Sequence, residues 1–265
     1  MSSEIFIKKP KVFLDSIYAN PLGEIRFENL TDDLNKFLEE QEIELIVDIG
    51  AGSAPVTLGL LHTHGDMKAV LVEPSRQLLE DAKLNQKKLG IEDSRVEYIE
   101  KSFEEYVLSG HINQFEGKKK LIVCHAVANW TDSPLEFIGE LLKLSDEDTF
   151  ISLVIGASIG KSLRFAHQGN LDDMISMVRT PGSAVGSLLE AEKVRPLNPI
   201  QVEELIKISN RIIYKAGVRI FADYIKPELL ENSERLKKVK EAENAARRKD
   251  EYWMLGQLVH YIISI

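Results

Sequence analysis

Short apolar runs alternate along this chain with segments whose apolar residues recur at helical spacing. The apolar runs lie near residues 43–49, 68–73, 95–100, 119–125 and 148–155. Such alternation predicts a parallel β-sheet whose strands are joined by crossover helices. Residues 211–214 and 218–221 then predict one further strand region, and 257–265 predict a closing strand. The hydrophobic pattern therefore predicts an α/β fold built on one sheet.

Two segments lie outside this alternation. The leader before the first strand contains an amphipathic pattern that predicts a helix at about 28–41. The insertion between the fifth strand and a predicted helix at 199–209 is rich in Gly, Ser and isolated charges. We interpret both as a cap over a substrate, with surface decoration as the alternative. The highly charged stretch 231–251 predicts a helix that is solvated on all sides.

Composition limits the compartment, the partners and the metal content that we expect for the chain. It is 44% hydrophobic, and no apolar run is long enough to span a bilayer. Met1-Ser2-Ser3-Glu4 does not begin a signal peptide, and the single cysteine, Cys124, excludes internal disulfides, so we expect a cytoplasmic protein. The net charge of −9 argues against general nucleic-acid binding but leaves room for a local basic face. His62 and His64 have no partner cluster, so no metal is expected.

The strongest functional signal is the stretch Val47-Asp48-Ile49-Gly50-Ala51-Gly52-Ser53-Ala54-Pro55. Its two alternate glycines follow a strand and let the backbone approach a ligand at the carboxyl edge of the sheet. A dinucleotide site requires a third glycine where Pro55 stands, and Asp48 would repel a pyrophosphate. A ligand without phosphate that carries an ammonium and a sulfonium fits this loop better. S-adenosylmethionine is such a ligand.

The next strand supports this interpretation. Residues 69–72 lead to Glu73, a carboxylate placed to accept hydrogen bonds from ribose hydroxyls. Pro74-Ser75 then begins a helix that stops at Gly90. Taken singly, the glycines suit a plain strand–helix turn and Glu73 suits a solvated strand end. Taken together on one β-α-β unit, they predict S-adenosylmethionine as the cofactor.

The expected fold class is a Rossmann-like class I methyltransferase. It has a mostly parallel seven-stranded sheet with helices on both faces and an antiparallel C-terminal strand. We expect a single domain over 1–265. Its parts are an N-terminal cap (1–42), the cofactor-binding core (43–156), a cap insertion (157–198) and C-terminal core elements (199–265).

The fourth strand ends at His125, and the loop that follows contains Trp130. Enzymes that methylate base amino groups commonly carry an Asn/Asp-Pro-Pro-aromatic motif at this place. Its absence argues against methylation of adenine or cytosine amines. His125 is either a satisfied core histidine or a ligand contact at the strand end. Trp130 either stacks on a base or fills the space between cap and sheet.

Blocks of sequence that resemble one family run nearly end to end. The most specific are His125-Ala126-Val127-x-x-Trp130 and Ala216-Gly217-Val218-Arg219-Ile220-Phe221-Ala222-Asp223-Tyr224. The others are Ile17-Tyr18, Gly23-Glu24-Ile25-Arg26, Gly169-Asn170-Leu171-Asp172, Asn198-Pro199-Ile200-Gln201-Val202 and Leu258-Val259-His260-Tyr261-Ile262. These blocks resemble the tRNA 5-carboxymethoxyuridine carboxyl methyltransferases, CmoM.

The resemblance implies that the product is a methyl ester on a modified wobble uridine and that the partner is the tRNA anticodon region. By position, the implied cofactor-binding residues are Arg26, Gly50, Ala51, Gly52, Glu73, Ser102, Phe103 and His125. To these we add Asp48, the acid that ends the strand before the loop. The chain departs from the family at Ala54 in the glycine loop. It also carries only scattered bases in the insertion, namely Lys161, Arg164, Arg179, Lys193 and Arg195. Residues 156–227 still hold ten Lys/Arg against seven Asp/Glu, which makes them the expected RNA face.

A 5-carboxymethoxy group presents a carboxylate that is ionised at neutral pH, so attack on the donor methyl requires no general base. The protein then has to align the groups and exclude water. Arg219 is the first candidate to hold the carboxylate bidentately and Arg195 the second, with a structural salt bridge as the alternative for both. Trp130 or Tyr224 is expected to stack on the base.

Two other functions fit the same loop. One is methylation of a small acid or metabolite under a closed cap. The other is a non-catalytic subunit that binds the methyl donor and stabilises a partner enzyme. No membrane and no metal is expected among the partners, and a second copy of the chain, in a homodimer, is a further candidate.

Overall fold

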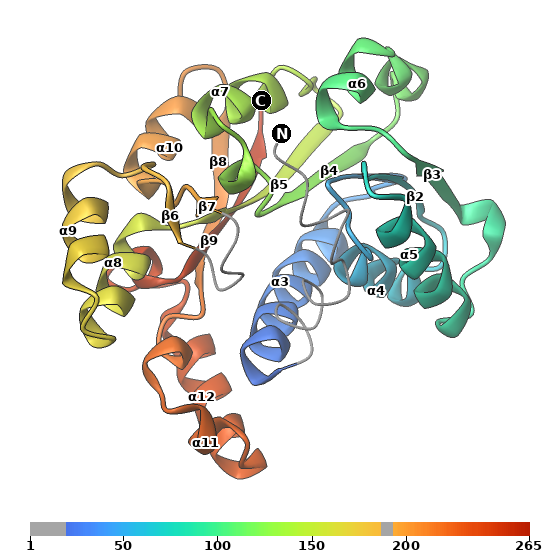
Figure 1. Ribbon diagram of the computed structural model, residues 1–265. Coiled ribbons are helices and arrows are strands. Elements are labelled where there is room, and N and C mark those ends of the chain that lie inside the picture. Colours follow the sequence, from blue (N-terminus) through green and yellow to red (C-terminus); the bar gives the residue numbers. More distant parts are fainter. Residues whose placement is uncertain (1–19, 187–192) are drawn as a thin grey trace.

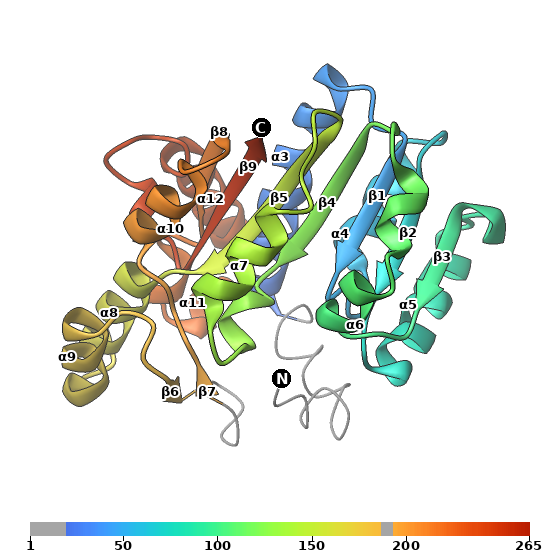
Figure 2. The same cartoon turned by 90° about the horizontal axis from the view of Figure 1, so that it is seen from above.

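A computed structural model describes residues 20–186 and 193–265 of the chain. Seven strands form one sheet in the order β3-β2-β1-β4-β5-β9-β8 (Figures 1 and 2). The strands are β1 Leu45–Ile49, β2 Lys68–Val72, β3 Val96–Ile99, β4 Lys120–His125, β5 Thr149–Gly156, β8 Arg211–Val218 and β9 Leu258–Ser264. β9 runs antiparallel to both of its neighbours, and the other pairs are parallel. The predicted fold class is confirmed.

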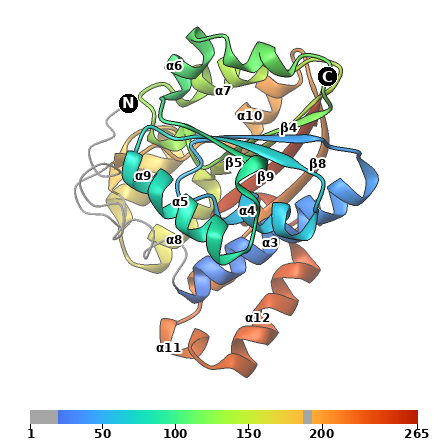
Figure 3. The ribbon, with the colours of Figure 1, turned by 90° about the vertical axis from the view of Figure 1, so that its right-hand side faces the viewer.

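Helices cover both faces of the sheet (Figure 3). One face carries α3 Pro21–Glu40, α4 Pro55–Thr63 and α5 Arg76–Lys88, and the other carries α6 Phe103–Leu108, α7 Pro134–Leu142 and α10 Pro199–Ile206. Because both faces are covered, the central strands are mostly apolar, and every residue of β1, including Asp48, is buried. This explains why the strands could be located from short continuous apolar runs.

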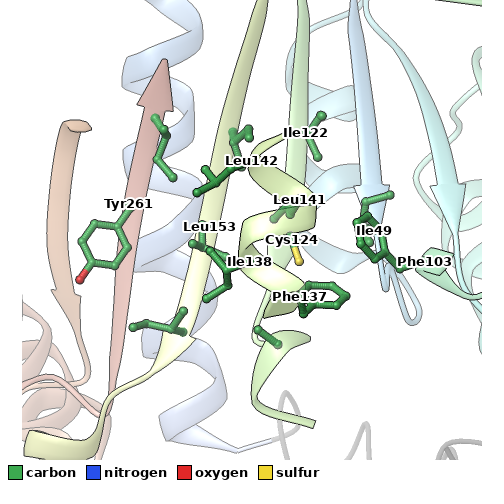
Figure 4. Packing of buried hydrophobic residues seen from close by; sticks show 14 of the residues in the cluster. Ile49, Phe103, Ile122, Cys124, Phe137, Ile138, Leu141, Leu142, Leu153 and Tyr261 are labelled. Carbon is green, nitrogen blue, oxygen red and sulfur yellow. The ribbon is translucent and has the colours of Figure 1, made fainter. Parts of the chain in front are cut away.

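The face under α7 shows how tightly the layers pack. Phe137, Ile138 and Leu141 of the helix lie over the sheet beside Cys124 of β4 (Figure 4). The thiol of Cys124 is free and buried, and burial raises its pKa. Cys124 therefore acts as a small apolar residue of the core rather than as a reactive group.

The predicted N-terminal cap needs a correction over residues 21–40. The helix begins at Pro21, because the Asn20 side chain caps it by accepting a hydrogen bond from the Gly23 N–H. Its apolar face, with Leu30 and Leu34 fully buried, joins the core cluster against the sheet. Residues 21–40 are thus a layer of the core, whereas 1–19, with the Ile17-Tyr18 block, lie outside the described residues.

Two predictions near the C-terminus are also wrong in part. The strand predicted over 218–221 ends at Val218, because Arg219 adopts a left-handed backbone with φ of 59°. The predicted solvated helix is α12 Ser233–Ala246, and it buries Glu243, which has no exposed surface. The Glu243 carboxylate accepts the backbone N–H groups of residues 220, 221 and 222 at 2.7, 2.8 and 3.0 Å.

The insertion contributes α8 Ser158–His167, α9 Leu171–Arg179 and a small hairpin, β6 Val185–Gly186 with β7 Lys193–Val194. Phe165, Met177 and Val185 form a core cluster of their own. Because α8 begins directly after β5, the insertion starts at the carboxyl edge of the sheet (Figure 1). In the described ranges, no helix is long and apolar enough to cross a membrane.

Candidate functional site

The candidate site lies at the edge of the sheet that is formed by the carboxyl ends of β1 and β4. The two strands are parallel neighbours, and their chains leave the sheet toward opposite faces, which is the arrangement that favours ligand binding. The loops after them are in contact at Gly50. A Cβ on Gly50 would lie only 2.4 Å from Cγ2 of Val127, and its φ of +69° also favours glycine.

The loop after β1 is held open by a series of left-handed residues. Gly50, Gly52 and Ala54 have φ of 69°, 57° and 52°. The N–H groups of Gly50 and Ala51 donate to the Val72 carbonyl of β2, at 2.8 and 3.1 Å. A Cβ on Gly52 would meet no atom within 4 Å, so this backbone is open to a ligand. Ala54 adopts the left-handed conformation without being a glycine, at a cost of roughly 1–2 kcal/mol.

Glu73 lies at the carboxyl edge of the sheet and also stabilises the loop after β1. It is 5% exposed, and its two carboxylate oxygens accept the N–H of Gly52 at 3.0 Å and of Ser75 at 2.9 Å. Burial raises the pKa of Glu73, and these two hydrogen bonds oppose the shift. Each carboxylate oxygen retains a further lone pair for a hydroxyl donor. The supporting role toward Gly52 is one that the sequence pattern did not predict.

Asp48 lies at the end of β1 and is 6% exposed. Its Oδ2 accepts a hydrogen bond of 2.6 Å from the Thr57 hydroxyl of α4. Burial, with the negative charge of Glu73 as a smaller cause, raises the pKa of Asp48 to about 7. A cation at this edge would therefore be attracted to Asp48 and would restore its ionised form.

Ser102 and Phe103 begin α6, after β3. Ser102 caps the helix by accepting from the Glu105 N–H at 3.2 Å, and the Glu105 side chain accepts the Ser102 N–H at 2.8 Å. The ring of Phe103 is buried against Phe137, with ring centroids 4.6 Å apart (Figure 4). The Phe103 side chain thus serves the core, and its predicted role at the cofactor remains a prediction for the backbone.

His125, at the end of β4, is partly buried and lies under α3. Its Nε2 is 2.8 Å from the Ser152 hydroxyl on β5. Burial, with the guanidinium of Arg26 on α3 as a further cause, lowers the pKa of His125 well below its ordinary value. His125 is therefore neutral, and the structure brings it near the predicted cofactor residue Arg26.

The residues predicted to bind the acceptor lie toward the β5, β8 and β9 side of the same edge. Nε and Nη2 of Arg219 donate to Asp223 at 2.8 and 2.9 Å. Arg164 of α8 also contacts Asp223, at 3.1 Å, and the Asp223 side chain is fully buried. The hydroxyl of Tyr224 donates to the Gly160 carbonyl at 3.0 Å. Arg219 thus already occupies a structural ion pair, and its clamp role stays a prediction.

The loop after β4 contains the remaining predicted residues. Trp130 ends the short helix η3 Ala128–Trp130 and is partly buried. Arg195 is tied to this loop, because its guanidinium donates to the Thr131 carbonyl at 3.3 Å and lies 3.3 Å from Asp132. The structure therefore separates the donor-side residues from Arg219 and Tyr224, and places Trp130 and Arg195 on the β4 loop.

Positive charge is in excess around Asp223. Lys161 lies one turn before Arg164 on α8 and forms no ion pair within the described part of the chain. Its ammonium lies 5.3 Å from the centre of the Phe165 ring. Burial, with Arg164 as the next cause, lowers the pKa of Lys161 to about 8. Lys161, Arg164 and Arg219 thus lie near Asp223, and Asp173 is the other carboxylate that acts on Lys161, so three cations face two carboxylates and favour an added anion. Among the described residues, no three His, Cys, Asp or Glu side chains are placed to hold a metal ion.

Comparison with known proteins identifies the fold of the chain but not its family. No family model and no curated protein matches the sequence. The chain is similar to the magnesium protoporphyrin IX methyltransferase ChlM of Synechocystis PCC 6803, solved with bound SAH, with a TM-score of 0.58 and 12% identity over 81% of this chain and 90% of that one.

Two plantazolicin methyltransferases are also similar. BamL, solved with a triazolic desmethylPZN analog and SAH, has a TM-score of 0.52 and 15% identity over 96% of this chain and 89% of its own. BpumL, solved with SAH, has a TM-score of 0.52 and 16% identity over 98% of this chain and 92% of its own. At these identities the likeness concerns the fold. The chain therefore has the Rossmann-like fold that these methyltransferases share.

Proposed function

We propose that this protein is an S-adenosylmethionine-dependent methyltransferase that transfers the methyl group to a carboxylate. The observation that carries the proposal is the β1 loop, in which Gly52 is left open and is braced by the buried carboxylate of Glu73. The likeness in fold to methyltransferases solved with SAH supports it.

The residues at the edge fit such a donor chemically. Glu73 has free lone pairs for ribose hydroxyls, and the open Gly52 backbone allows close approach. Asp48, with its raised pKa, gains from a nearby cation, and His125 is neutral and so does not repel one. A bound donor of this class supplies an electrophilic methyl group.

The acceptor is proposed to be anionic because of the charges around Asp223. Lys161, Arg164 and Arg219 leave an excess of positive charge at the carboxyl edge, in a setting where burial strengthens its pull on an anion. A carboxylate is already ionised at neutral pH and has no proton to lose. The protein therefore needs to orient it and exclude water, and no general base is required.

The finer proposal is that this carboxylate belongs to 5-carboxymethoxyuridine at the tRNA wobble position. It rests on the sequence blocks around His125 and Arg219 and on the basic excess of residues 156–227. Trp130 and Tyr224 are the proposed stacking residues for the splayed base. Nucleoside mass spectrometry of tRNA from a deletion strain tests it. Loss of the methyl ester supports the proposal, whereas an unchanged ester rejects tRNA as the substrate.

Donor binding has its own test. Calorimetry is expected to show binding of S-adenosylmethionine and its demethylated product, but not of NAD. Glu73→Ala should weaken donor binding by roughly 1–3 kcal/mol, because the ribose hydroxyls lose their acceptor. Glu80→Ala, at an exposed position on α5, is the control and should bind normally. Equal affinity of the wild type for NAD and for the donor would reject the proposal.

A second candidate is methylation of a small-molecule acid. The net charge of −9 favours it, since long-range attraction to a polyanion such as tRNA is weak. Labelled donor incubated with tRNA and with a panel of small carboxylic acids separates the two. Turnover on an acid, with no labelling of tRNA that bears 5-carboxymethoxyuridine, would establish the second candidate.

A further inference from the structure

A continuous chain of hydrogen bonds crosses three adjacent strands beneath α3. Nε2 of His125 on β4 is 2.8 Å from the Ser152 hydroxyl on β5, which is 2.9 Å from Nε2 of His260 on β9. Nδ1 of His260 is in turn 2.9 Å from Oδ2 of Asp33 on α3. Ser152, His260 and Asp33 are all buried. The chain therefore links the edge of the sheet to a carboxylate deep in the core.

The far end of this chain of hydrogen bonds is the carboxylate of Asp33, which is held as an anion. Arg247 binds Asp33 through both Nη atoms, and Arg248 donates to Asp33 at 2.9 Å. The Tyr214 hydroxyl also donates to Asp33. Although burial opposes it, the hydrogen bond from His260 and the Arg247 guanidinium hold the pKa of Asp33 well below its ordinary value. Asp33 is thus ionised and only accepts hydrogen bonds.

The ionised carboxylate of Asp33 determines which atom carries each proton along this chain of hydrogen bonds. Because Asp33 only accepts, Nδ1 of His260 must carry a proton. In a neutral imidazole the other nitrogen, Nε2, is then an acceptor, so the Ser152 hydroxyl donates to it. The Ser152 oxygen is left as acceptor for His125, and Nε2 of His125 must carry its proton. Nδ1 of His125 accepts no hydrogen bond from the described residues and is left as the acceptor of the ring.

We propose that Asp33, His260 and Ser152 are positioning residues that fix His125 as the Nε2–H tautomer and so present its Nδ1 as a hydrogen-bond acceptor at the carboxyl end of β4. The ligand group that suits this acceptor is the α-ammonium of the methyl donor, a part of the inference that rests on the proposed function. A neutral imidazole accepts from an ammonium without repelling it.

The reverse direction of the chain requires a protonated His260. His260 would then donate to Ser152, Ser152 would donate to His125, and Nδ1 of His125 would become a donor. Asp33 is already matched by two guanidinium groups, those of Arg247 and Arg248. A third buried cation on His260 would have no compensating anion, and an uncompensated buried charge is costly. The charge balance therefore favours the neutral His260 and the first direction.

The test is the tautomer itself, measured without ligand by nitrogen-15 NMR of the imidazole rings in the whole protein. We expect His125 to show a protonated Nε2 and an unprotonated Nδ1 at neutral pH. Ser152→Ala should change this pattern to a mixture of tautomers, since Nε2–H loses its acceptor. The control is Ser109→Ala, which removes a hydroxyl bonded to the Tyr106 carbonyl, outside the chain. A protonated Nδ1 in the wild type, or an unchanged pattern in Ser152→Ala, overturns the inference.

A pair of substitutions tests the acceptor role. The amide oxygen of Asn reaches the position of Nδ1, whereas the amide nitrogen of Gln reaches that of Nε2. His125→Asn should therefore retain donor affinity better than His125→Gln, by roughly tenfold for one charge-assisted hydrogen bond. The opposite order overturns the ammonium assignment. If the wild type binds no donor at all, the proposed function fails, while the NMR result still decides the tautomer.

Discussion

At the scale of single residues, the donor side is governed by two carboxylates that end neighbouring strands. Asp48 ends β1 and Glu73 follows β2, and burial raises the pKa of both. Close carboxylates in a desolvated place cannot both ionise freely. A cationic ligand relieves this conflict, which explains why the loop suits a donor that carries an ammonium and a sulfonium.

The raised pKa of Asp48 makes donor binding depend on pH. The affinity of the wild type should rise as the pH passes upward through about 7, because only the ionised Asp48 attracts a cation. Asp48→Asn should bind more weakly above pH 7 and show a flatter profile. Calorimetry in buffers of different ionisation enthalpy should detect proton release near neutrality for the wild type alone. A profile for Asp48→Asn that matches the wild type would contradict this.

The same group predicts a trend in stability for the free protein. Between the ordinary value of 3.8 and about 7, folded Asp48 binds a proton that the unfolded chain has released. Its contribution to the free energy of unfolding therefore falls as the pH rises through this window. Asp48→Asn should gain in Tm relative to the wild type at pH 8 and lose that gain near pH 4. Thermal melts across the range measure it, and a gain that is the same at both pH values would contradict it.

Arg219 has two roles that need separate tests: the proposed binding of the acceptor carboxylate and the ion pair with Asp223. Arg219→Lys keeps the charge but loses the planar fork that binds Asp223. If Arg219 orients the acceptor, methyl transfer should fall sharply while tRNA binding barely changes. Arg164→Lys, which alters the other guanidinium on Asp223, is the matched control for the ion pair. A loss of Tm in Arg219→Lys equal to that in Arg164→Lys, with methyl transfer unchanged, would assign Arg219 a structural role only.

At the scale of elements, residues on the buried side of α12 connect this helix to α3 and to the turn after β8. Glu243 holds the N–H groups of the turn that follows β8, and Arg247, directly after the helix, reaches Asp33 on α3. Lys240 on the same helix pairs with Glu24 and Glu28 of α3. The helix thus joins α3 to the turn that carries Arg219.

Replacing Glu243 should loosen that turn. In Glu243→Gln, one carboxylate oxygen becomes an NH₂ group that faces a backbone N–H, so a buried donor is left unsatisfied. We expect the free energy of unfolding to fall by about 1–3 kcal/mol. Glu241→Gln, at an exposed position on α12, is the control and should change little. Urea denaturation measures both, and equal stabilities would contradict the role assigned to Glu243.

At the scale of the whole molecule, the charge is divided unevenly. The chain carries −9, yet residues 156–227 hold ten Lys/Arg against seven Asp/Glu. If tRNA binds, it should bind through this segment. Arg179→Gln, at the exposed end of α9, should weaken binding and reduce the slope of log affinity against log salt by about one. Lys88→Gln on α5 is the control. An unchanged slope in Arg179→Gln would remove α9 from the interface.

The strands and the donor loop could be predicted because their signals are local. A strand buried on both faces is mostly apolar, and a left-handed turn favours glycine, so Val47–Gly52 and 69–73 are recognisable from neighbouring residues alone. Ser75 and Gly90 likewise mark the two ends of α5 through capping within a few residues. The sheet with its antiparallel closing strand, as found, follows from this order of elements.

What the sequence by itself determined was therefore the class of fold and the place of the donor loop within it. Only the tertiary structure decided which charged residues are buried and with whom they pair. Arg247 and Asp33 are 214 residues apart, and no local pattern shows that these two charged residues are buried against each other. Burial and partners set the pKa of Asp48, the neutrality of His125 and the ion pair of Arg219. These properties come from desolvation and charge at short range, and both exist only when distant segments are brought together.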